Sequence, residues 1–373
     1  MDLESRLEPV LSVAGKHAAT VDSEARFPAE AVLALRSSGL LGLTIPEEYG
    51  GIGAGPPEFS DVVSRLAGVC GSTAMVYLMH VSAAMPVVGA TPAGLPDLPR
   101  QLADGRLLAT LAFSEPGSRS HFWAPVSQAK RDNGEVRLDA AKSWVTSAGY
   151  ADLYVTSTLS ADQDGAIDVY TIEAGDAGAT VTGSFTGLGL RGNASAPMRF
   201  DTTTSDDARV GGAGTGFDLM TGTVMPWFNL GNAAVSHGLA SAAAEAAIRH
   251  VSTAKLQHTE QVLAELPTIR ARVAQMSLGL EAAGAYLRSA AASIAAPDEQ
   301  TPLRVFGVKA LANDTALSVT DDAMRVCGGA AFSQHLPLER FFRDARAGHV
   351  MAPTADALYD FYGKAITGLP LFG

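Results

Sequence analysis

The segment Lys142-Ser-Trp-Val-Thr-Ser-Ala148 lies in a β-prone part of the chain. Short runs rich in β-branched and aromatic residues occur on both sides of it, and turn sequences such as Asp132-Asn-Gly134 and Asp164-Gly165 separate them. Several short runs at this spacing predict an all-β unit, either a barrel or a sandwich. The predicted strands are residues 107–113, 136–138, 153–158, 166–172 and 198–200.

Helical periodicity flanks this β unit on both sides. Residues 3–19 and 28–38 carry apolar side chains at helical spacing, and the period returns at 217–254, 263–292 and 303–326. The predicted fold is therefore α+β and multi-domain. It has an N-terminal helical domain at 1–106, a central β domain at 107–215 and a C-terminal four-helix bundle at 216–373.

Composition narrows the class of protein. The chain has 373 residues, 47% of them apolar and 18% charged, which is enough apolar material for a large packed core. Its 27 basic and 39 acidic residues give a net charge of −12, which argues against nucleic acid and anionic membranes as partners.

Two cysteines and the N-terminal residues favour a cytoplasmic location. Cys70 and Cys327 form neither a metal-type spacing nor a disulfide framework, so we expect no metal site. The N-terminal residues do not resemble a signal peptide. We find no apolar run of the roughly 18 residues that a membrane span needs, so we expect no membrane contact.

Four further motifs occur in order along the chain. They are Ile45-Pro-Glu-Glu-Tyr-Gly-Gly51, Ala112-Phe-Ser-Glu-Pro-Gly-Ser-Arg-Ser120, Arg325-Val-Cys-Gly-Gly-Ala330 and Leu338-Glu-Arg-Phe-Phe-Arg-Asp-Ala345. Together with Lys142–Ala148 they resemble the acyl-CoA dehydrogenase superfamily over nearly the whole chain. This resemblance implies a flavin-dependent oxidoreductase, a flavin between the β unit and the C-terminal bundle, and a homo-oligomer, either a dimer or a tetramer.

The resemblance assigns flavin contacts to particular residues. Ser114, with Phe113 beside it, matches the hydroxyl that bonds the flavin edge, Trp144 matches the aromatic side chain that covers one face, and Thr146 matches the hydroxyl near N5. The backbone at 328–329, Gly328 and Gly329, matches the part that approaches the diphosphate and adenosine half. Taken singly, a tryptophan in a β-rich segment is usually a core residue, and a Gly pair after a helix is usually a C-cap. The implied cofactor is FAD, with FMN as the alternative.

Substrate contacts are implied at three positions. Ser120 matches a residue near the thioester tail of the substrate, and His121 follows it where the family has an aspartate. Phe228 lies on the first helix of the bundle, at one of the two places where the family carries its catalytic glutamate.

The expected catalytic base is missing from both places. The usual position, counted from Arg343-Asp344-Ala345, is Ala352, and the other falls near Phe228 with Asn229 beside it. Abstraction of the α-proton needs a base within hydrogen-bond reach. His349 and Asp356 lie within about one helical turn of Ala352 and are the candidates for a relocated base.

Three functions remain open at this stage. The first is desaturation of an acyl thioester on CoA or on a carrier protein, with an electron-transfer protein as the redox partner. The second is a two-component monooxygenase that takes reduced flavin from a reductase and therefore needs no α-proton base. Residues 255–260 lack the Arg and Phe-Gly features that grip the flavin adenosine, which would suit an exchanging flavin. The third is a catalytically degenerate subunit.

Overall fold

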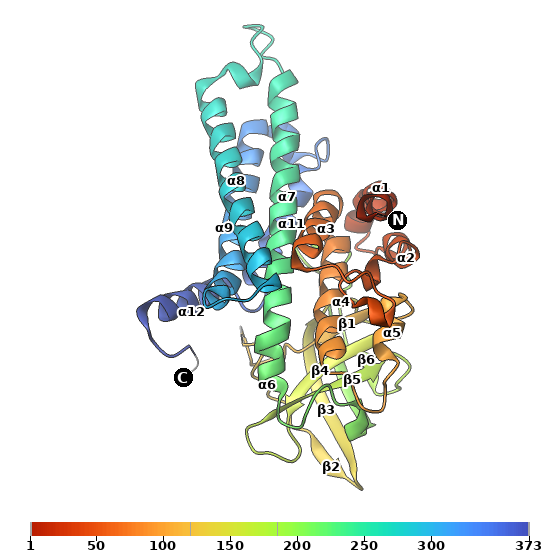
Figure 1. Cartoon of the computed structure of the whole chain (residues 1–373). Helices are drawn as coiled ribbons and strands as arrows, with labels where there is room; N and C mark the ends of the chain where they lie inside the picture. Colours follow the sequence, from red (N-terminus) through yellow and green to blue (C-terminus); the bar gives the residue numbers. More distant parts are fainter. Residues whose placement is uncertain (1, 120, 185, 372–373) are drawn as a thin grey trace. The chain divides into compact units, whose positions relative to one another are not determined.

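The computed structural model describes residues 2–119, 121–184 and 186–371. Its contacts group the chain into two compact units. The first unit comprises residues 1–59, 72–187 and 191–228, and the second comprises 60–71, 188–190 and 229–373. Along the chain, helices come first, strands follow and helices return, as Figure 1 shows, which confirms the predicted α–β–α order. The domain boundaries after residues 106 and 215 stay a prediction.

The N-terminal helices form where their apolar periodicity predicts them. In the first of these, the side chain of Asp2 caps the helix by accepting a hydrogen bond from the Ser5 backbone N–H at 2.8 Å. Leu7, Val10 and Ala14 are buried at spacings of three and four residues, so one stripe of the helix faces the core. The N-terminal helices are α1 (Leu3–Ser23), α2 (Ala29–Ser37), α3 (Pro56–Val69), α4 (Gly71–Gly89) and α5 (Leu98–Ala103), with 3₁₀ turns at Leu40–Gly42 and Glu47–Tyr49.

Helix α4 corrects one expectation. Its length and a mean hydropathy of 1.3 are sufficient for a membrane span, so the sequence does contain an apolar run of that size. However, 89% of the apolar window is buried inside the protein, as in the core helix of a globular domain. The imidazole of His80 and the hydroxyl of Tyr77 accordingly bond to backbone within the fold.

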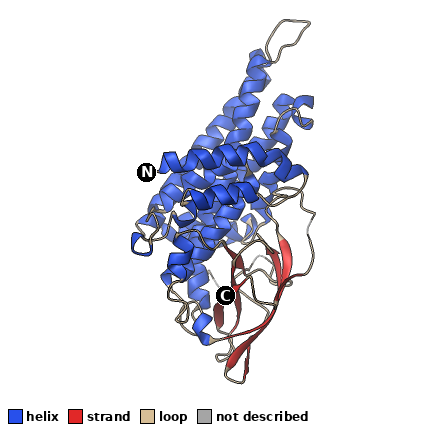
Figure 2. Cartoon of the chain, turned by 90° about the vertical axis from the view of Figure 1, so that its right-hand side faces the viewer, coloured by secondary structure: helices blue, strands red, loops and turns tan. Residues whose placement is uncertain are grey.

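The central strands form two sheets. In one, β1 runs parallel to β4 and β4 pairs antiparallel with β5, while in the other the antiparallel order is β2-β3-β7-β6. Figure 2 shows the strands gathered in one region, and β2 forms a short antiparallel hairpin with the start of β3. Tyr154 and Phe200, one from each sheet, meet edge to face at 5.6 Å in the shared core. The strands are β1 (Ala109–Ala112), β2 (Lys130–Asp132), β3 (Glu135–Val145), β4 (Leu153–Leu159), β5 (Ile167–Glu173), β6 (Ala179–Val181) and β7 (Ala196–Thr204).

The second unit is a helical bundle built around α9. Val305, Val308, Ala312 and Val319 are buried along this helix, as the sequence spacing predicts. Small residues also bring helices close together, because a Cβ at Gly238 of α7 would lie 2.0 Å from the Ser64 carbonyl oxygen of α3. The helices that follow the sheets are α6 (Gly216–Leu219), α7 (Met225–Thr253), α8 (Pro267–Ala295), α9 (Thr301–Cys327), α10 (Gly329–Phe332), α11 (Leu338–Val350) and α12 (Ala355–Thr367), with a π-helical turn at Met220–Val224 and 3₁₀ turns at Asp206–Ala208 and Leu263–Glu265.

Candidate functional site

The end of β3 presents Trp144 from an irregular backbone. The register of β3 against β7 shifts between Lys142 and Val145. Within this irregularity Trp144 has a φ of 54°, a conformation that bulky residues rarely adopt. Trp144 is 59% exposed, whereas Val145 and Thr146 on its C-terminal side are buried. A core tryptophan would be buried, so the core interpretation of Trp144 is wrong, and its contact with a flavin face stays a prediction.

Hydrogen bonds hold the neighbours of Trp144 in one region of the first unit. The Ser143 backbone N–H donates to the Ser114 carbonyl oxygen at 2.8 Å. The Thr110 hydroxyl donates to the Thr146 carbonyl oxygen, also at 2.8 Å. The structure therefore brings Ser114, Trp144 and Thr146 together, as a shared flavin contact requires.

A buried ion pair between Lys142 and Glu115 lies next to these residues, and the sequence did not predict this pair. Lys142 Nζ lies 2.5 Å from Glu115 Oε1 and also donates to the Ser157 carbonyl oxygen at 2.6 Å. The other carboxylate oxygen of Glu115 accepts backbone N–H bonds from Val126 and Ser127 at 2.6 and 2.7 Å. Burial opposes ionisation of Glu115, but Lys142 and the bonds from Ser127 outweigh it and hold the pKa of this carboxyl below its usual range. Glu115 is therefore an ionised, fully bonded carboxylate and cannot serve as the missing base.

The residues predicted to contact flavin or substrate near this segment differ in their surroundings. The Phe113 ring is buried and stacks on Phe122, with the two ring centroids 6.2 Å apart, so Phe113 offers a ligand only its backbone. His121 is exposed, and its ring lies 5.2 Å from that of Trp123. Ser120 lies outside the described residues. Substrate contacts by Ser120 and His121 stay predictions.

Gly328 and Gly329 connect α9 to α10 in the second unit. Gly328 has a φ of 57° and a ψ of −133°, a backbone conformation open mainly to glycine. A Cβ added at either glycine would meet nothing within 4 Å, so this backbone is open to a close approach. The next apolar side chain, Phe332, is 85% exposed. Gly328 is also the C-cap of α9, which confirms the structural interpretation of this motif, and its contact with a flavin stays a prediction.

Neither of the family's base positions holds a carboxylate. Ala352 is partly buried in the connection between α11 and α12. Phe228 is buried, and the neighbouring Asn229 amide donates to the Val305 carbonyl oxygen at 3.0 Å. The Asn229 Oδ1 atom has no hydrogen-bond partner among the residues that the structure describes.

The two candidates for the relocated base, His349 and Asp356, have different surroundings in the structure. His349, at the end of α11, has its Nδ1 atom 3.3 Å from Asp314 Oδ1 on α9, which is within ion-pair distance, but Nδ1 forms no hydrogen bond with the described residues. The other oxygen of Asp314 accepts a 2.5 Å hydrogen bond from the Tyr359 hydroxyl. Burial, and then the bond to Asp314, raise the pKa of Tyr359 to about 12. Asp356, by contrast, is exposed in the first turn of α12.

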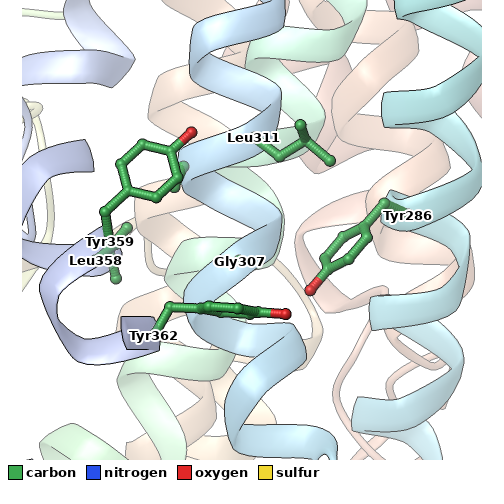
Figure 3. A pocket seen from close by; sticks show the side chains of 7 residues that line it. Tyr286, Gly307, Leu311, Leu358, Tyr359 and Tyr362 are labelled. Carbon is green, nitrogen blue, oxygen red and sulfur yellow. The ribbon is translucent and has the colours of Figure 1, made fainter. Parts of the chain in front are cut away.

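A cavity of about 190 Å³ lies beside this group in the second unit. Figure 3 shows Tyr286, Tyr359 and Tyr362 around it, with Gly307 on the α9 side. A Cβ at Gly307 would lie 2.4 Å from the Tyr286 hydroxyl oxygen, so glycine leaves the room that this phenol occupies. The remaining lining residues are Ala310, Leu311 and Leu358.

Comparison with known proteins decides the family. Three family models match the chain in order: the acyl-CoA dehydrogenase N-terminal domain at 10–91, the middle domain at 110–203 and the C-terminal domain at 214–366. The probable acyl-CoA dehydrogenase FadE25 of Mycobacterium tuberculosis is 32% identical over 346 residues, which cover 91% of this chain and 87% of that protein. This chain belongs to the acyl-CoA dehydrogenase family.

A second enzyme sequence and a solved structure agree with this family assignment. Cyclohex-1-ene-1-carbonyl-CoA dehydrogenase of Syntrophus aciditrophicus is 28% identical over 339 residues, covering 90% of this chain and 81% of that enzyme. The structure of butyryl-CoA dehydrogenase from Megasphaera elsdenii matches with a TM-score of 0.90 at 22% identity, over 98% of this chain and 99% of that one. The acyl-CoA dehydrogenase fold predicted from the sequence is thereby confirmed.

As an acyl-CoA dehydrogenase family member, the protein is a flavin-dependent oxidoreductase with FAD as its cofactor. The exposed indole of Trp144 and the open Gly328–Gly329 backbone are features that such a cofactor needs, so the residues present fit it. Among the described residues, no group of three or more His, Cys, Asp or Glu side chains is arranged to hold a metal ion.

Proposed function

We propose that this acyl-CoA dehydrogenase family protein desaturates the α,β bond of an acyl thioester carried by CoA or by a carrier protein. His349 takes the part of the usual glutamate in this proposal. The observation that carries it is the pairing of His349 with Asp314 immediately before the segment where that glutamate normally stands. The names of the relatives, which include several acyl-CoA dehydrogenases, support the same class of substrate.

The imidazole of His349 suits the proton transfer. Bound FAD supplies the acceptor for the hydride that leaves the β-carbon. The α-proton goes to Nε2 of the imidazole, since Nδ1 faces Asp314. The Asp314 carboxylate lies 3.3 Å from Nδ1, close enough to stabilise the positive charge that the ring gains. The Tyr359 hydroxyl holds the second oxygen of Asp314 and so fixes the carboxylate.

The other carboxylates near these segments suit the task less well. Asp356 is exposed in the first turn of α12, where water would compete for its lone pairs. Glu115 has its oxygens committed to Lys142, Val126 and Ser127. We therefore prefer His349 over Asp356 as the relocated base.

The remaining site residues have roles on the flavin side. Trp144 covers one face of the isoalloxazine, Ser114 and Thr146 bond its edge, and the backbone of Phe113 lies beside them. Gly328 and Gly329 admit the diphosphate and adenosine half. Phe228, buried at the start of the bundle, borders the acyl group.

Partners follow from the proposed reaction. We infer an electron-transfer protein as the oxidant of the reduced cofactor and a homo-oligomer, either a dimer or a tetramer, as the working form. The three domains of the family would then divide at residues 106 and 215. A cytoplasmic location stays a prediction.

Anaerobic mixing of the FAD-loaded protein with acyl-CoA thioesters of increasing chain length tests the reaction. Loss of the visible flavin absorbance with formation of the enoyl product is the expected result. His349→Ala should keep its FAD but lose this reduction, whereas Asp356→Asn should retain it. Normal reduction in His349→Ala together with loss in Asp356→Asn would reverse the assignment of the base.

A second candidate function is hydroxylation by reduced flavin and O2. The observation that favours it is that Ala352, Phe228 and Asn229 provide no carboxylate at either usual position. This reaction needs no α-proton base. A protein that no acyl thioester reduces, yet that consumes O2 once a flavin reductase supplies reduced flavin, would establish the monooxygenase. Failure to bind flavin in either redox state would instead indicate a degenerate subunit.

A further inference from the structure

Lys309 is a buried cation bonded only to backbone. It lies on α9 and is 0% exposed. Its Nζ atom donates to three carbonyl oxygens, those of Gly348 at 2.9 Å, Met351 at 3.0 Å and Pro353 at 2.8 Å. These carbonyls span the C-terminal end of α11 and its connection to α12, the segment that contains Ala352.

This arrangement is costly, which suggests that it serves a purpose beyond packing. Moving an ammonium group out of water without a counter-charge is unfavourable, and no carboxylate among the described residues forms an ion pair with Lys309. Burial accordingly lowers the pKa of Lys309 to about 7. The three carbonyls, with the negative end of the α11 dipole, offset part of that cost. An apolar side chain would fill the same volume without the cost of burying a charge.

Further polar side chains hold the same segment from α9 and α7. The Asn313 amide, one turn beyond Lys309, donates to the Gly348 carbonyl oxygen at 2.8 Å. Its Oδ1 atom accepts a 2.7 Å hydrogen bond from the Ser236 hydroxyl of α7. The amide nitrogen of Asn232, also on α7, lies 3.7 Å from the Met351 sulfur atom. Two helices therefore fix residues 348–353 through their backbone and one side chain.

Gly348 makes this close approach feasible. A Cβ at that position would lie 2.7 Å from Asn313 Oδ1 and 2.9 Å from the Ser236 hydroxyl oxygen. The polar groups thus reach the backbone of the segment directly, because no side chain stands between them. We call Lys309, Asn313 and Ser236 the loop clamp.

We propose that Lys309, through the loop clamp, is a positioning residue that holds residues 348–353 in the geometry needed for proton abstraction from the substrate. The inference rests on the proposed function, because it makes His349 the group that the clamp positions. Lys309 touches neither the imidazole nor the reacting atoms in this account. It acts by fixing the backbone on both sides of position 352.

The test compares the FAD-loaded full chain with Lys309→Met, which keeps the length of the side chain and removes its three donors. Two readouts are needed: amide hydrogen exchange of residues 348–352 and the rate of anaerobic flavin reduction by an acyl-CoA. We expect faster exchange in this segment and a roughly tenfold to hundredfold lower kcat, with KM and FAD content unchanged. Lys16→Met, at an exposed site on α1, is the control and should leave both readouts as in the wild type.

Each alternative outcome decides the inference. Unchanged exchange at 348–352 would overturn the clamp, and faster exchange with a normal kcat would reduce it to a structural contact. If Lys309→Met does not fold, Asn313→Ser removes one donor from the same carbonyl and is judged by the same two readouts. A wild-type protein that acyl thioesters fail to reduce would refute the proposed function, and the exchange measurement would then decide the clamp by itself.

Discussion

The Nδ1 atom of His349 lies 3.3 Å from the carboxylate of Asp314, across the packing of α11 against α9. Neither residue belongs to the motifs that identify the family, and the two are far apart in the sequence. Their proximity places an imidazole beside a carboxylate, next to a segment from which the usual glutamate is absent. The role of His349 as the base can therefore be tested by changing Asp314, which does not itself accept the proton.

Asp314→Asn should slow reduction of the flavin by an acyl thioester by at least about tenfold. An amide cannot stabilise the imidazolium, and it can hold the ring in the wrong tautomer. FAD content and thermal stability should change little, because Asp314 is partly exposed. Stopped-flow mixing of the anaerobic, FAD-loaded variant with acyl-CoA measures the rate.

Tyr359→Phe is the matched control for that variant. It removes the hydrogen bond from the Tyr359 hydroxyl to Asp314 but leaves the carboxylate beside His349. The expected loss of rate is therefore smaller than for Asp314→Asn. Equal and normal rates in both variants would exclude the His349–Asp314 pair from the reaction.

Trp144→Ala should lower FAD occupancy and activity together. The indole is 59% exposed in the structure without cofactor, so its removal takes little from the core and much from a ligand-facing surface. Extraction and quantification of flavin from the purified variant, with its thermal midpoint measured in parallel, provide the check. Trp144→Phe keeps an aromatic face and should bind more FAD than the alanine variant. Full occupancy in Trp144→Ala would contradict the assignment.

The order of the helices and strands could be predicted from local sequence pattern, whereas the residues that each element contacts in the fold could not. Helical periodicity at 303–326 identified the buried face of α9, because a repeated apolar spacing specifies one face without any tertiary information. The same periodicity does not show that Lys309 turns inward to backbone carbonyls some forty residues later. The apolar run of helix α4 was missed, because Thr73, Tyr77 and His80 interrupt its apolar character although the fold buries them.

The candidate site shows a similar division. Ser114, Trp144 and Thr146 could be proposed because motif order carries them, whereas the contacts of Glu115, Lys142 and Asp314 were not predicted. One signal for the buried pair was present: Lys142 is in phase with the inward-facing residues of β3, whose exposure alternates along the strand. A lysine at an inward strand position requires a partner, and such a requirement can be read from the sequence. No comparable signal marks Asp314, because only tertiary packing places it against His349.

Glu115→Gln should destabilise the first unit by about 3 to 5 kcal/mol, because it leaves the Lys142 ammonium buried without its counter-charge. Chemical denaturation of the apo protein measures the change. Asp162→Asn, which breaks a solvent-screened pair with Arg131, is the control and should lower the free energy of unfolding far less. A comparable loss in both variants would mean that burial adds nothing to the Glu115–Lys142 pair.

His80 should make the stability of the protein depend on pH on the acid side of neutrality. Its Nε2 atom lies 2.9 Å from the Leu41 carbonyl oxygen, and its Nδ1 atom accepts the Ala109 backbone N–H at 3.0 Å, so the buried ring is neutral. Burial lowers the pKa of His80 from 6.5 to about 4. Because the folded state resists the proton, its stabilisation is complete above pH 6.5 and is lost as the pH falls through about 4, up to about 3 kcal/mol. His80→Gln can donate and accept in the same two directions without titrating. The difference in unfolding free energy between wild type and His80→Gln should therefore shift across this window, and two parallel pH curves would show that His80 does not titrate there.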